Sequence, residues 1–483
     1  MGVLENLEPK SVFYFFEEIC NIPHGSKNEK KLSDYIVHFA EKKGLYYRQD
    51  EKNNVLIKKT ATQGYETQPT IILQSHIDMV CEKNGNIEHD FEKDGLKLII
   101  EDGKIKADGT TLGADNGIGV AYMLAILDAE NIAHPDIEAI FTTEEEIGMG
   151  GAKAFDVSDL KGKIFINLDS EEQGELVISC CGGNKTNVLL PIVWEKVPEW
   201  GMPYLLKITG LKGGHSGTDI HLQRANANKL MGRILLQIFN VYDIRICNIL
   251  GGEKDNAIPR EAETVLLLKS DDVEAIKKML VLLNKALNNE YKQSENNISV
   301  SLLPMTEKIG ECFSKDTVKK LISILLLIPY GIETMDIYTD LVESSSNIGA
   351  VKTEKEHIIF CNAIRSSVAS KQRFIAHKID IIASLTGSKT EVTGEYPEWP
   401  AKRESHICKV CQELYKELYR QELKITSIHA GLECGIFSGK LKDIDMVSFG
   451  PNITGAHSPD EKADIDSVIK IWEFLLKVIA YKN

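Results

Sequence analysis

Apolar and polar positions follow different periods along the first third of the chain. Helical spacing of apolar side chains covers residues 11–21 and 28–43, and a nearly unbroken apolar run occupies residues 116–131. Short β-branched and apolar runs lie before and after it, at residues 54–59, 70–75, 137–143, 163–168 and 175–180. Because strands alternate with helices, the pattern predicts an α/β domain with a parallel or mixed sheet, against which the apolar helix is buried.

A different pattern occupies the middle of the chain and predicts a second sheet backed by helices, an α+β arrangement. Strands are expected at residues 204–211, 244–250, 263–269, 298–303 and 357–364, and helices at residues 225–239, 272–291 and 371–385. Pro397 and Pro400 mark the end of this part, after which a helix, two strands and a final helix follow. We therefore predict a discontinuous first domain of residues 1–184 and 398–483, with a mixed sheet sandwiched by helices, and an inserted domain of residues 185–397.

Composition and charge exclude several classes of protein. The 483 residues are 43% hydrophobic and 26% charged, which is ordinary for a globular chain and allows two or three domains. A net charge of −15 argues against nucleic acid or an anionic membrane as a partner. The longest apolar stretch, residues 321–332, is too short to span a bilayer and contains Pro329.

The cysteines and the N-terminal segment predict a cytoplasmic protein. Ten cysteines are scattered along the chain, and the pair Cys408 and Cys411 lacks the second Cys-x-x-Cys pair that a zinc site of this kind needs. The N-terminal segment has no basic region followed by an apolar one, so it does not resemble a signal peptide. Both observations favour reduced thiols in the cytoplasm.

Histidine and acidic residues follow the predicted strands at the points where the strands end. His76 and Asp78 come directly after residues 70–75, and their spacing places both on one side of an extended chain. A metal-bound histidine needs its second ring nitrogen held, and a neighbouring carboxylate commonly holds it. A His-x-Asp pair also arises by chance, so it indicates a metal site only together with other ligands.

Further segments bring acids and a second histidine to strand ends. Asp115 lies between a glycine turn and the apolar helix, where it could cap the helix or offer one oxygen to each of two metal ions. Asp169 and His457 follow two other predicted strands. Because ligand sites of α/β sheets form where strand ends gather, these residues together predict a centre for two zinc ions.

The acidic triplet Glu144, Glu145 and Glu146 follows the strand at residues 137–143 and precedes glycines that allow a sharp turn. A lone triplet of this kind is ordinarily a solvated loop. Beside metal ligands another interpretation applies, because adjacent side chains on an extended backbone point in opposite directions. One carboxylate can then bind a cation while its neighbour accepts a proton from water.

Seven motifs, in order along the chain, carry a family resemblance: QSHIDMV, GTTLGADNGIGVA, TTEEEIGMGGA, INLDSEE, GLKGGHSGTDIH, NAIPREAE and GPNITGAHSPDE. The set resembles the bacterial aminoacyl-histidine dipeptidases, also called Xaa-His or cytosolic non-specific dipeptidases. These enzymes belong to the clan of dizinc peptidases that includes carnosinase, aminoacylase and carboxypeptidase G. The resemblance runs from residue 19 to the last predicted helix, so it covers nearly the whole chain.

The resemblance implies a metallopeptidase whose first domain is the catalytic one and holds two Zn²⁺ ions per chain, with Co²⁺ or Mn²⁺ as substitutes. Asp115 would bridge the two ions. His76 and Asp169 would complete one site. Glu146 and His457 would complete the other.

Catalytic roles follow from the same resemblance. Glu145 would be the general base, and Asp78 would orient His76. The peptide bond between Asp115 and Asn116 would be cis. The remaining acid of the triplet matches no catalytic role in the family.

The inserted domain would be a lid that carries dimerisation and substrate contacts, which implies a homodimer. In relatives, the histidine that matches His215 reaches the active site of the other subunit and polarises the scissile carbonyl or holds its oxyanion. Asn256 and Arg365 would contact the substrate backbone and its C-terminal carboxylate. His429 and Glu433 would also touch the substrate. Without the resemblance, all of these would be interpreted as ordinary loop or surface residues.

The expected function is metal-dependent hydrolysis of dipeptides, of Xaa-His type and with broad specificity. The alternative is an aminoacylase or another exopeptidase of the same clan, with the same metals and a different pocket. A catalytically inactive peptide-binding relative would lack a ligand or Glu145, and none of these is missing. No glycine-rich nucleotide motif follows the first strand. The resemblance implies a dipeptide as the partner, and the net charge argues against nucleic acid or a membrane.

Overall fold

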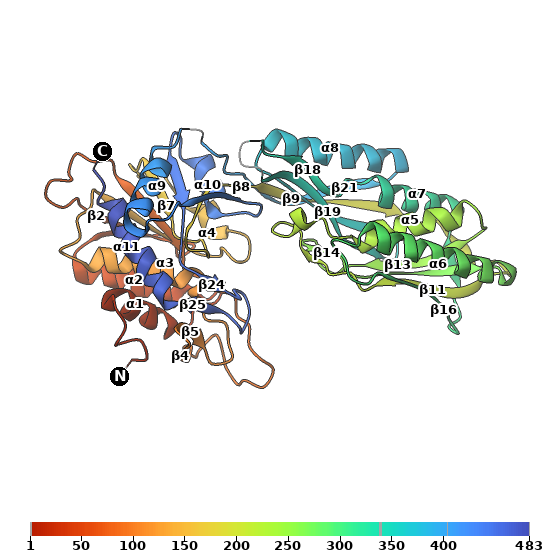
Figure 1. Cartoon of the computed structure of the whole chain (residues 1–483), viewed down its shortest axis with the longest axis horizontal. Coiled ribbons are helices and arrows are strands. Elements are labelled where there is room, and N and C mark those ends of the chain that lie inside the picture. The colour runs from red at the N-terminus through yellow and green to blue at the C-terminus, as the bar shows by residue number, and fades with distance from the viewer. Residues whose placement is uncertain (1, 338–340, 403, 483) are drawn as a thin grey trace. The chain divides into compact units, whose positions relative to one another are not determined.

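The computed structural model describes residues 2–337, 341–402 and 404–482 and contains two compact units (Figure 1). The first unit contains Met1–Cys180, Trp399–Ser427 and Leu432–Asn483, and the second contains Cys181–Glu398 and Ile428–Gly431. The roles predicted for the two parts of the chain, catalysis in one and substrate contacts with dimerisation in the other, stay predictions.

An eight-stranded sheet forms the centre of the first unit. Its strands are β1 Tyr46–Gln49, β2 Val55–Lys59, β3 Ile71–His76, β6 Ile137–Thr142, β7 Ile164–Asn167, β8 Glu175–Cys180, β22 Lys424–Ile428 and β23 Asp445–Ser448. The order across the sheet is β1-β2-β6-β3-β7-β23-β8-β22. The four central strands β6, β3, β7 and β23 run parallel, so their carboxyl ends meet at one edge of the sheet.

Helices cover both faces of this sheet. They are α1 Lys10–Cys20, α2 Lys30–Lys43, α3 Ala114–Asp128, α4 Gly150–Ala154, α9 His406–Tyr419, α10 Glu433–Lys440 and α11 Ile465–Ile479. Successive side chains of a strand point to opposite faces. In β7, Ile166 joins the core shared by α1, α3 and α11, whereas the ring of Phe165 lies 5.1 Å from the ring of Phe437 in α10. The predicted α/β fold with a mixed, helix-covered sheet is confirmed.

A small four-stranded sheet of the first unit was not predicted from the sequence. It contains β4 Leu98–Glu101, β5 Lys104–Ala107, β24 Ile453–Thr454 and β25 Lys462–Asp464, in the order β24-β25-β5-β4. The strands β24 and β25 form a hairpin, and His457 lies in the loop that joins them. This sheet therefore anchors one of the predicted metal ligands.

The second unit is built on a sheet of nine strands. They are β9 Gly182–Pro191, β11 Met202–Thr209, β13 Arg245–Gly251, β15 Ala262–Leu268, β16 Ser299–Pro304, β18 Gly331–Met335, β19 Val342–Thr353, β20 His357–Ser366 and β21 Lys389–Tyr396. The order is β16-β11-β15-β13-β19-β20-β9-β21, with β18 also paired to β19. The five strands predicted for this region are confirmed as β11, β13, β15, β16 and β20, whereas β9, β18, β19 and β21 were not foreseen.

Four long helices lie along this sheet and share its apolar core (Figure 1). They are α5 Ala227–Phe239, α6 Val273–Glu290, α7 Lys315–Leu327 and α8 Ala369–Thr386. Short elements complete the unit: the pair β10 Trp194–Lys196 with β17 Glu311–Phe313, the pair β12 Gly214–His215 with β14 Ala257–Ile258, and two 3₁₀ turns at Ile220–Leu222 and Ser270–Asp272. None of the helices in the described residues combines the length and apolar character that crossing a membrane requires.

Candidate metal centre

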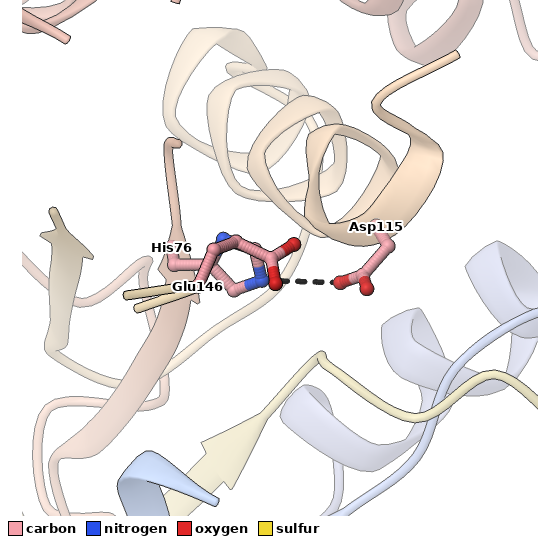
Figure 2. Close-up of side chains that lie close together, drawn as sticks. All are labelled: His76, Asp115 and Glu146. Carbon is pink, nitrogen blue, oxygen red and sulfur yellow. Dashed lines mark hydrogen bonds and ion pairs between the residues drawn. The ribbon is translucent and has the colours of Figure 1, made fainter. Parts of the chain in front are cut away.

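The parallel strands of the first unit bring the predicted ligands to one edge of the sheet. His76 is the last residue of β3, and Asp169 lies two residues beyond β7. Glu146 lies in the loop after β6, and Asp115 is the second residue of α3. Figure 2 shows the side chains of His76, Asp115 and Glu146 lying close together, and one ligand atom from each lies within 4.8 Å of the other two.

The ligand atoms form two groups that share Asp115. The first group joins His76 Nε2 to Asp115 Oδ1 at 3.1 Å and to Asp169 Oδ1 at 3.3 Å. The second group joins His457 Nε2 to Asp115 Oδ2 at 3.2 Å and to Glu146 Oε2 at 3.0 Å. The two oxygens of one carboxylate thus face two different histidines, which is the arrangement expected of a residue that bridges two cations.

The donor set and its spacing fit divalent cations. Nitrogen and oxygen ligands lie about 2.0–2.1 Å from a tetrahedral zinc ion, so two neighbouring ligand atoms are separated by about 3.3–3.4 Å. The separations in both groups, 3.0–3.3 Å, are close to that value. In the described part of the chain, Glu146 Oε1 is buried without a hydrogen-bond partner. A buried carboxylate oxygen is costly unless something pairs with it, and a bound cation would do so.

The ionisable groups of the cluster shift one another's pKa values in the direction that favours bound positive charge. Burial lowers the pKa of His76, but the charge of Asp169 and hydrogen bonds to the neighbouring carboxylates raise it well above its ordinary value. Hydrogen bonds to Asp115 and Glu146 raise the pKa of His457 to about 11. Burial raises the pKa of Asp169 to about 6. The cluster therefore stabilises positive charge, whether protons or divalent cations carry it.

Asp78 is buried and holds both His76 and the loop after β6. Its two carboxylate oxygens accept hydrogen bonds from the backbone N–H groups of Glu145, at 3.0 Å, and Glu146, at 3.2 Å. Ser26 donates a third, at 2.8 Å. The closer acceptor for His76 Nδ1 is the backbone carbonyl of Asp78, at 2.9 Å, whereas the carboxylate lies at 3.5 Å. With Nδ1 donating, the lone pair of Nε2 is available for a cation.

The three adjacent acids of the triplet have different environments. Both oxygens of Glu144 lie 3.0 Å from Lys52 Nζ, and its backbone is left-handed, with φ of 55°. Glu146 contacts His457, as described above. Burial raises the pKa of Glu145 well above its ordinary value, His76 opposes that shift, and nearby carboxylates add to it. A raised pKa makes a carboxylate a stronger base, which suits proton transfer.

Asn116 belongs to the site but was not assigned a role from the sequence. Its side-chain N–H donates to Asp169 Oδ1 at 2.5 Å, and the peptide bond that joins Asp115 to Asn116 is cis, as predicted. The signal was present, because this asparagine directly follows the predicted bridging residue. A side-chain contact between segments 53 residues apart cannot, however, be read from the sequence.

Glu433, predicted to touch the substrate, is fully buried at the start of α10. Its carboxylate accepts hydrogen bonds from Gln74, at 2.5 Å, and Thr142, at 2.6 Å. Burial raises its pKa to about 8. In this structure Glu433 therefore supports β3 and β6 from within the unit, and contact with a substrate would need a surface that its side chain does not expose.

The other residues predicted to act on the substrate lie in the second unit. Arg365 is mostly buried and donates to the hydroxyl of Tyr396 at 2.8 Å, and its Nε lacks a hydrogen-bond partner among the described residues. Burial, together with the charge of Arg365, lowers the pKa of His215 and lowers that of His429 to about 3. His429 Nε2 is hydrogen-bonded to Ser345 Oγ at 2.7 Å. These side chains form a cationic cluster with two neutral histidines.

Asn256 lies beside this cluster but is exposed. Its backbone carbonyl accepts a hydrogen bond from Ser216 at 2.8 Å, and its neighbour Ala257 pairs with His215 in the β12–β14 ribbon. The backbone of Asn256 therefore helps to place His215, and its side chain is free to meet a ligand.

Comparison with known proteins finds relatives along nearly the whole chain, in the peptidase family that the sequence motifs resemble. The model of "Peptidase family M20/M25/M40" matches residues 72–481. The cytosol non-specific dipeptidase of Escherichia coli (strain K12) is 38% identical over 480 residues, which cover 99% of this chain and 99% of that protein. The aminoacylhistidine dipeptidase from Vibrio alginolyticus has a crystal structure that covers 99% of this chain and 97% of its own, with a TM-score of 0.91 and 38% identity.

A more distant structure supports the fold alone. The aminopeptidase PepT from Bacillus cereus is 16% identical and covers 98% of both chains, with a TM-score of 0.56.

Replacing Asp78 by Asn is expected to weaken cation binding about ten- to hundredfold, because hydrogen-bonded partners of metal ligands commonly contribute that much. The amide would place an N–H₂ group against the backbone N–H of Glu145 or Glu146, where the carboxylate now accepts. Metal content after dialysis against a buffered series of free Zn²⁺ measures the change. Glu144→Gln is the matched control, since this acid of the same loop pairs with Lys52 instead. Equal metal affinity in the Asp78 variant and the control would contradict the prediction.

Proposed function

The chain belongs to peptidase family M20/M25/M40, and on this basis we propose that it is a metal-dependent dipeptidase of broad specificity that accepts Xaa-His dipeptides. The observation that carries the proposal is the sharing of Asp115 between two ligand groups, each with its own histidine. The names of the Escherichia coli and Vibrio alginolyticus relatives support the substrate class.

Two divalent cations per chain are part of this proposal. His76 and Asp169 would hold one, Glu146 and His457 the other, and Asp115 would bridge them. Nitrogen and carboxylate ligands favour zinc, and Co²⁺ or Mn²⁺ suit the same donors. When bound, the cations would supply a water of lowered pKa and a positive charge beside the peptide carbonyl.

Glu145 is proposed to move the proton. Its backbone is fixed by Asp78, and its half-buried carboxylate lies beside the ligands but holds none of the described ligand contacts. It would take a proton from the attacking water and deliver it to the departing amine. Its raised pKa makes the carboxylate a stronger base for the first transfer.

The cluster in the second unit is proposed to recognise the substrate. A buried guanidinium without an acidic partner among the described residues is costly, so Arg365 is suited to a ligand carboxylate, which it can bind through two hydrogen bonds. His215, with a lowered pKa, would act as a neutral donor to the oxyanion. Asn256 and His429 would complete the contacts with the dipeptide. No observation in the described residues favours the aminoacylase alternative.

We also propose a cytoplasmic location. The name of the Escherichia coli relative supports it, and all ten cysteines are free of disulfide bonds.

A homodimer is proposed from one exposed face of the second unit. Phe374, Ile381 and Leu385 of α8 are 61%, 60% and 79% exposed, and their spacing of seven and four residues places them on one side of the helix. The neighbouring strand β21 ends the order of the sheet, so its outer edge can pair with another strand. A two-fold axis would pack α8 against α8 and β21 against β21 of a second copy. This contact would cover the exposed apolar side of α8 and the open edge of β21.

Changing Glu145 to Gln is expected to leave the cation content unchanged and to lower kcat for Xaa-His dipeptides about 10²- to 10⁴-fold, the usual contribution of a general base. Metal analysis and amino-acid release, measured on the same samples before and after chelation, test this. Activity in wild type that survives complete removal of the metal would contradict the proposed function. Near-wild-type kcat in the variant would contradict the role of Glu145.

Changing Arg365 to Ala is expected to raise KM for dipeptides roughly ten- to hundredfold, since a hydrogen bond to a charged group contributes about 1.5–3 kcal/mol. The same change should affect the C-terminal amide of the dipeptide much less, because the amide carries no negative charge. The ratio of kcat/KM for the two substrates measures the effect. Arg233→Ala, which removes an exposed arginine of α5, serves as control. An unchanged ratio in the Arg365 variant would rule out the carboxylate contact.

Changing Leu385 to Glu is expected to dissociate the dimer, because it places charge on the exposed apolar side of α8 proposed as the contact. Sedimentation velocity at micromolar protein should show a dimer for wild type and a monomer for the variant. Leu282→Glu on α6 is the control, since this leucine is similarly exposed, at 70%, on another helix. A monomeric wild type, or a dimer in both variants, would exclude this face as the interface.

A further inference from the structure

The hairpin of β24 and β25 carries two side chains that meet the segment around Asp115. His457 lies in its loop in a left-handed conformation, with φ of 62°. Glu461 follows four residues later, directly before β25, and only 2% of its surface is exposed. The loop is closed by hydrogen bonds from the N–H of Ser458 to the carbonyl of Gly455 and from the N–H of Glu461 to the carbonyl of Ser458. The two side chains therefore belong to one compact turn.

The carboxylate of Glu461 accepts four backbone hydrogen bonds at the start of α3. Oε2 accepts from the N–H groups of Leu112, at 2.7 Å, and Gly113, at 3.0 Å. Oε1 accepts from those of Ala114, at 2.8 Å, and Asp115, at 3.3 Å. Asp115 and Asn116 lack helical backbone angles, so these four N–H groups precede the regular turns of α3 and need acceptors from elsewhere. Glu461 therefore fixes the backbone of the bridging residue.

The hairpin thus holds Asp115 at two points. His457 contacts the side chain of Asp115 at Oδ2, and Glu461 contacts its backbone N–H. A displacement of the hairpin would change both contacts together. The ligands on the other side of the bridge are not carried by the hairpin, because His76 ends the central strand β3 and Asp169 lies two residues beyond β7.

We propose that Glu461 is a positioning residue that keeps Asp115 and His457 in register, and that it controls binding of the cation at Glu146 and His457 more than binding of the cation at His76 and Asp169. This inference rests on the proposed function, since it concerns the two cation sites assigned there. Glu461 is not itself a ligand, but its removal would affect the two cation sites unequally.

The change Glu461→Gln tests this at constant side-chain size. It removes the charge and turns an N–H₂ group toward N–H donors, so at least two of the four hydrogen bonds lose their acceptor. One of the two Zn²⁺ equivalents, assigned to Glu146 and His457, is expected to bind about ten- to hundredfold more weakly, while the other changes little. Glu461→Ala removes all four hydrogen bonds. It is expected to weaken the same Zn²⁺ equivalent, and by a larger factor.

The matched control is Glu138→Gln. Glu138, on β6, is also buried and accepts hydrogen bonds from the backbone N–H groups of Lys161 and Gly162, but it contacts none of the ligands. The same substitution there removes a comparable structural carboxylate. Thermal unfolding of each metal-free protein shows how much stability each change costs, independently of metal binding.

The measurement is titration of metal-free protein with Zn²⁺ against a chromogenic chelator of known affinity. Two equivalents in wild type and in the Glu138 variant, with selective loss of one equivalent in the Glu461 variants, would support the inference. Two equivalents of wild-type affinity in Glu461→Gln, or equal weakening of both, would overturn it while leaving the proposed function intact. A wild type that binds no stoichiometric Zn²⁺ would overturn both.

Discussion

The gathering of negative charge at one edge of a parallel sheet is the constraint on which the first unit depends. Carboxylates at neighbouring strand ends repel one another, and burial increases the cost of ionising them. The chain offsets part of this cost with backbone donors, because Asp78 accepts from the N–H groups of Glu145 and Glu146, and Glu461 accepts from the start of α3. These bonds hold the acids in place against repulsion but do not neutralise them. Positive charge, on protonated histidines or on bound cations, supplies the remaining compensation.

A buried chain of polar side chains links the strands beneath the ligands. Ser448 donates to Asn167 at 2.5 Å, Asn167 to Gln74 at 2.7 Å, and Gln74 to Glu433 at 2.5 Å. Thr142 joins the same carboxylate at 2.6 Å. Since β23, β7, β3 and β6 each contribute a member, the network ties together the four strands whose ends lead to the ligands. Buried networks of this kind favour one arrangement, because each broken bond leaves a polar group unpaired.

The sequence predicted which candidate ligands lie together better than it predicted the elements that hold them. His76 stands out because it ends an apolar run, and Asp115 because it precedes one directly after a glycine turn, and both are local signals. Glu461 gives no such signal, since a glutamate in a glycine-rich turn is ordinarily solvated and the N–H groups it binds lie 346 to 349 residues away. The strands β19 and β21 were missed for a related reason. Serines in β19 and exposed polar residues in β21 remove the apolar alternation by which strands are recognised.

Among the described residues, the two units contain buried groups of opposite charge that lack a full set of partners. In the first unit, the described ion pairs of the ligand carboxylates are with histidines alone. In the second, Arg365 is buried among neutral partners. Each arrangement would be costly if it served folding only, because replacing such groups by apolar ones is often neutral or stabilising. Cations would compensate the charge of the first unit, and a ligand carboxylate would compensate that of the second.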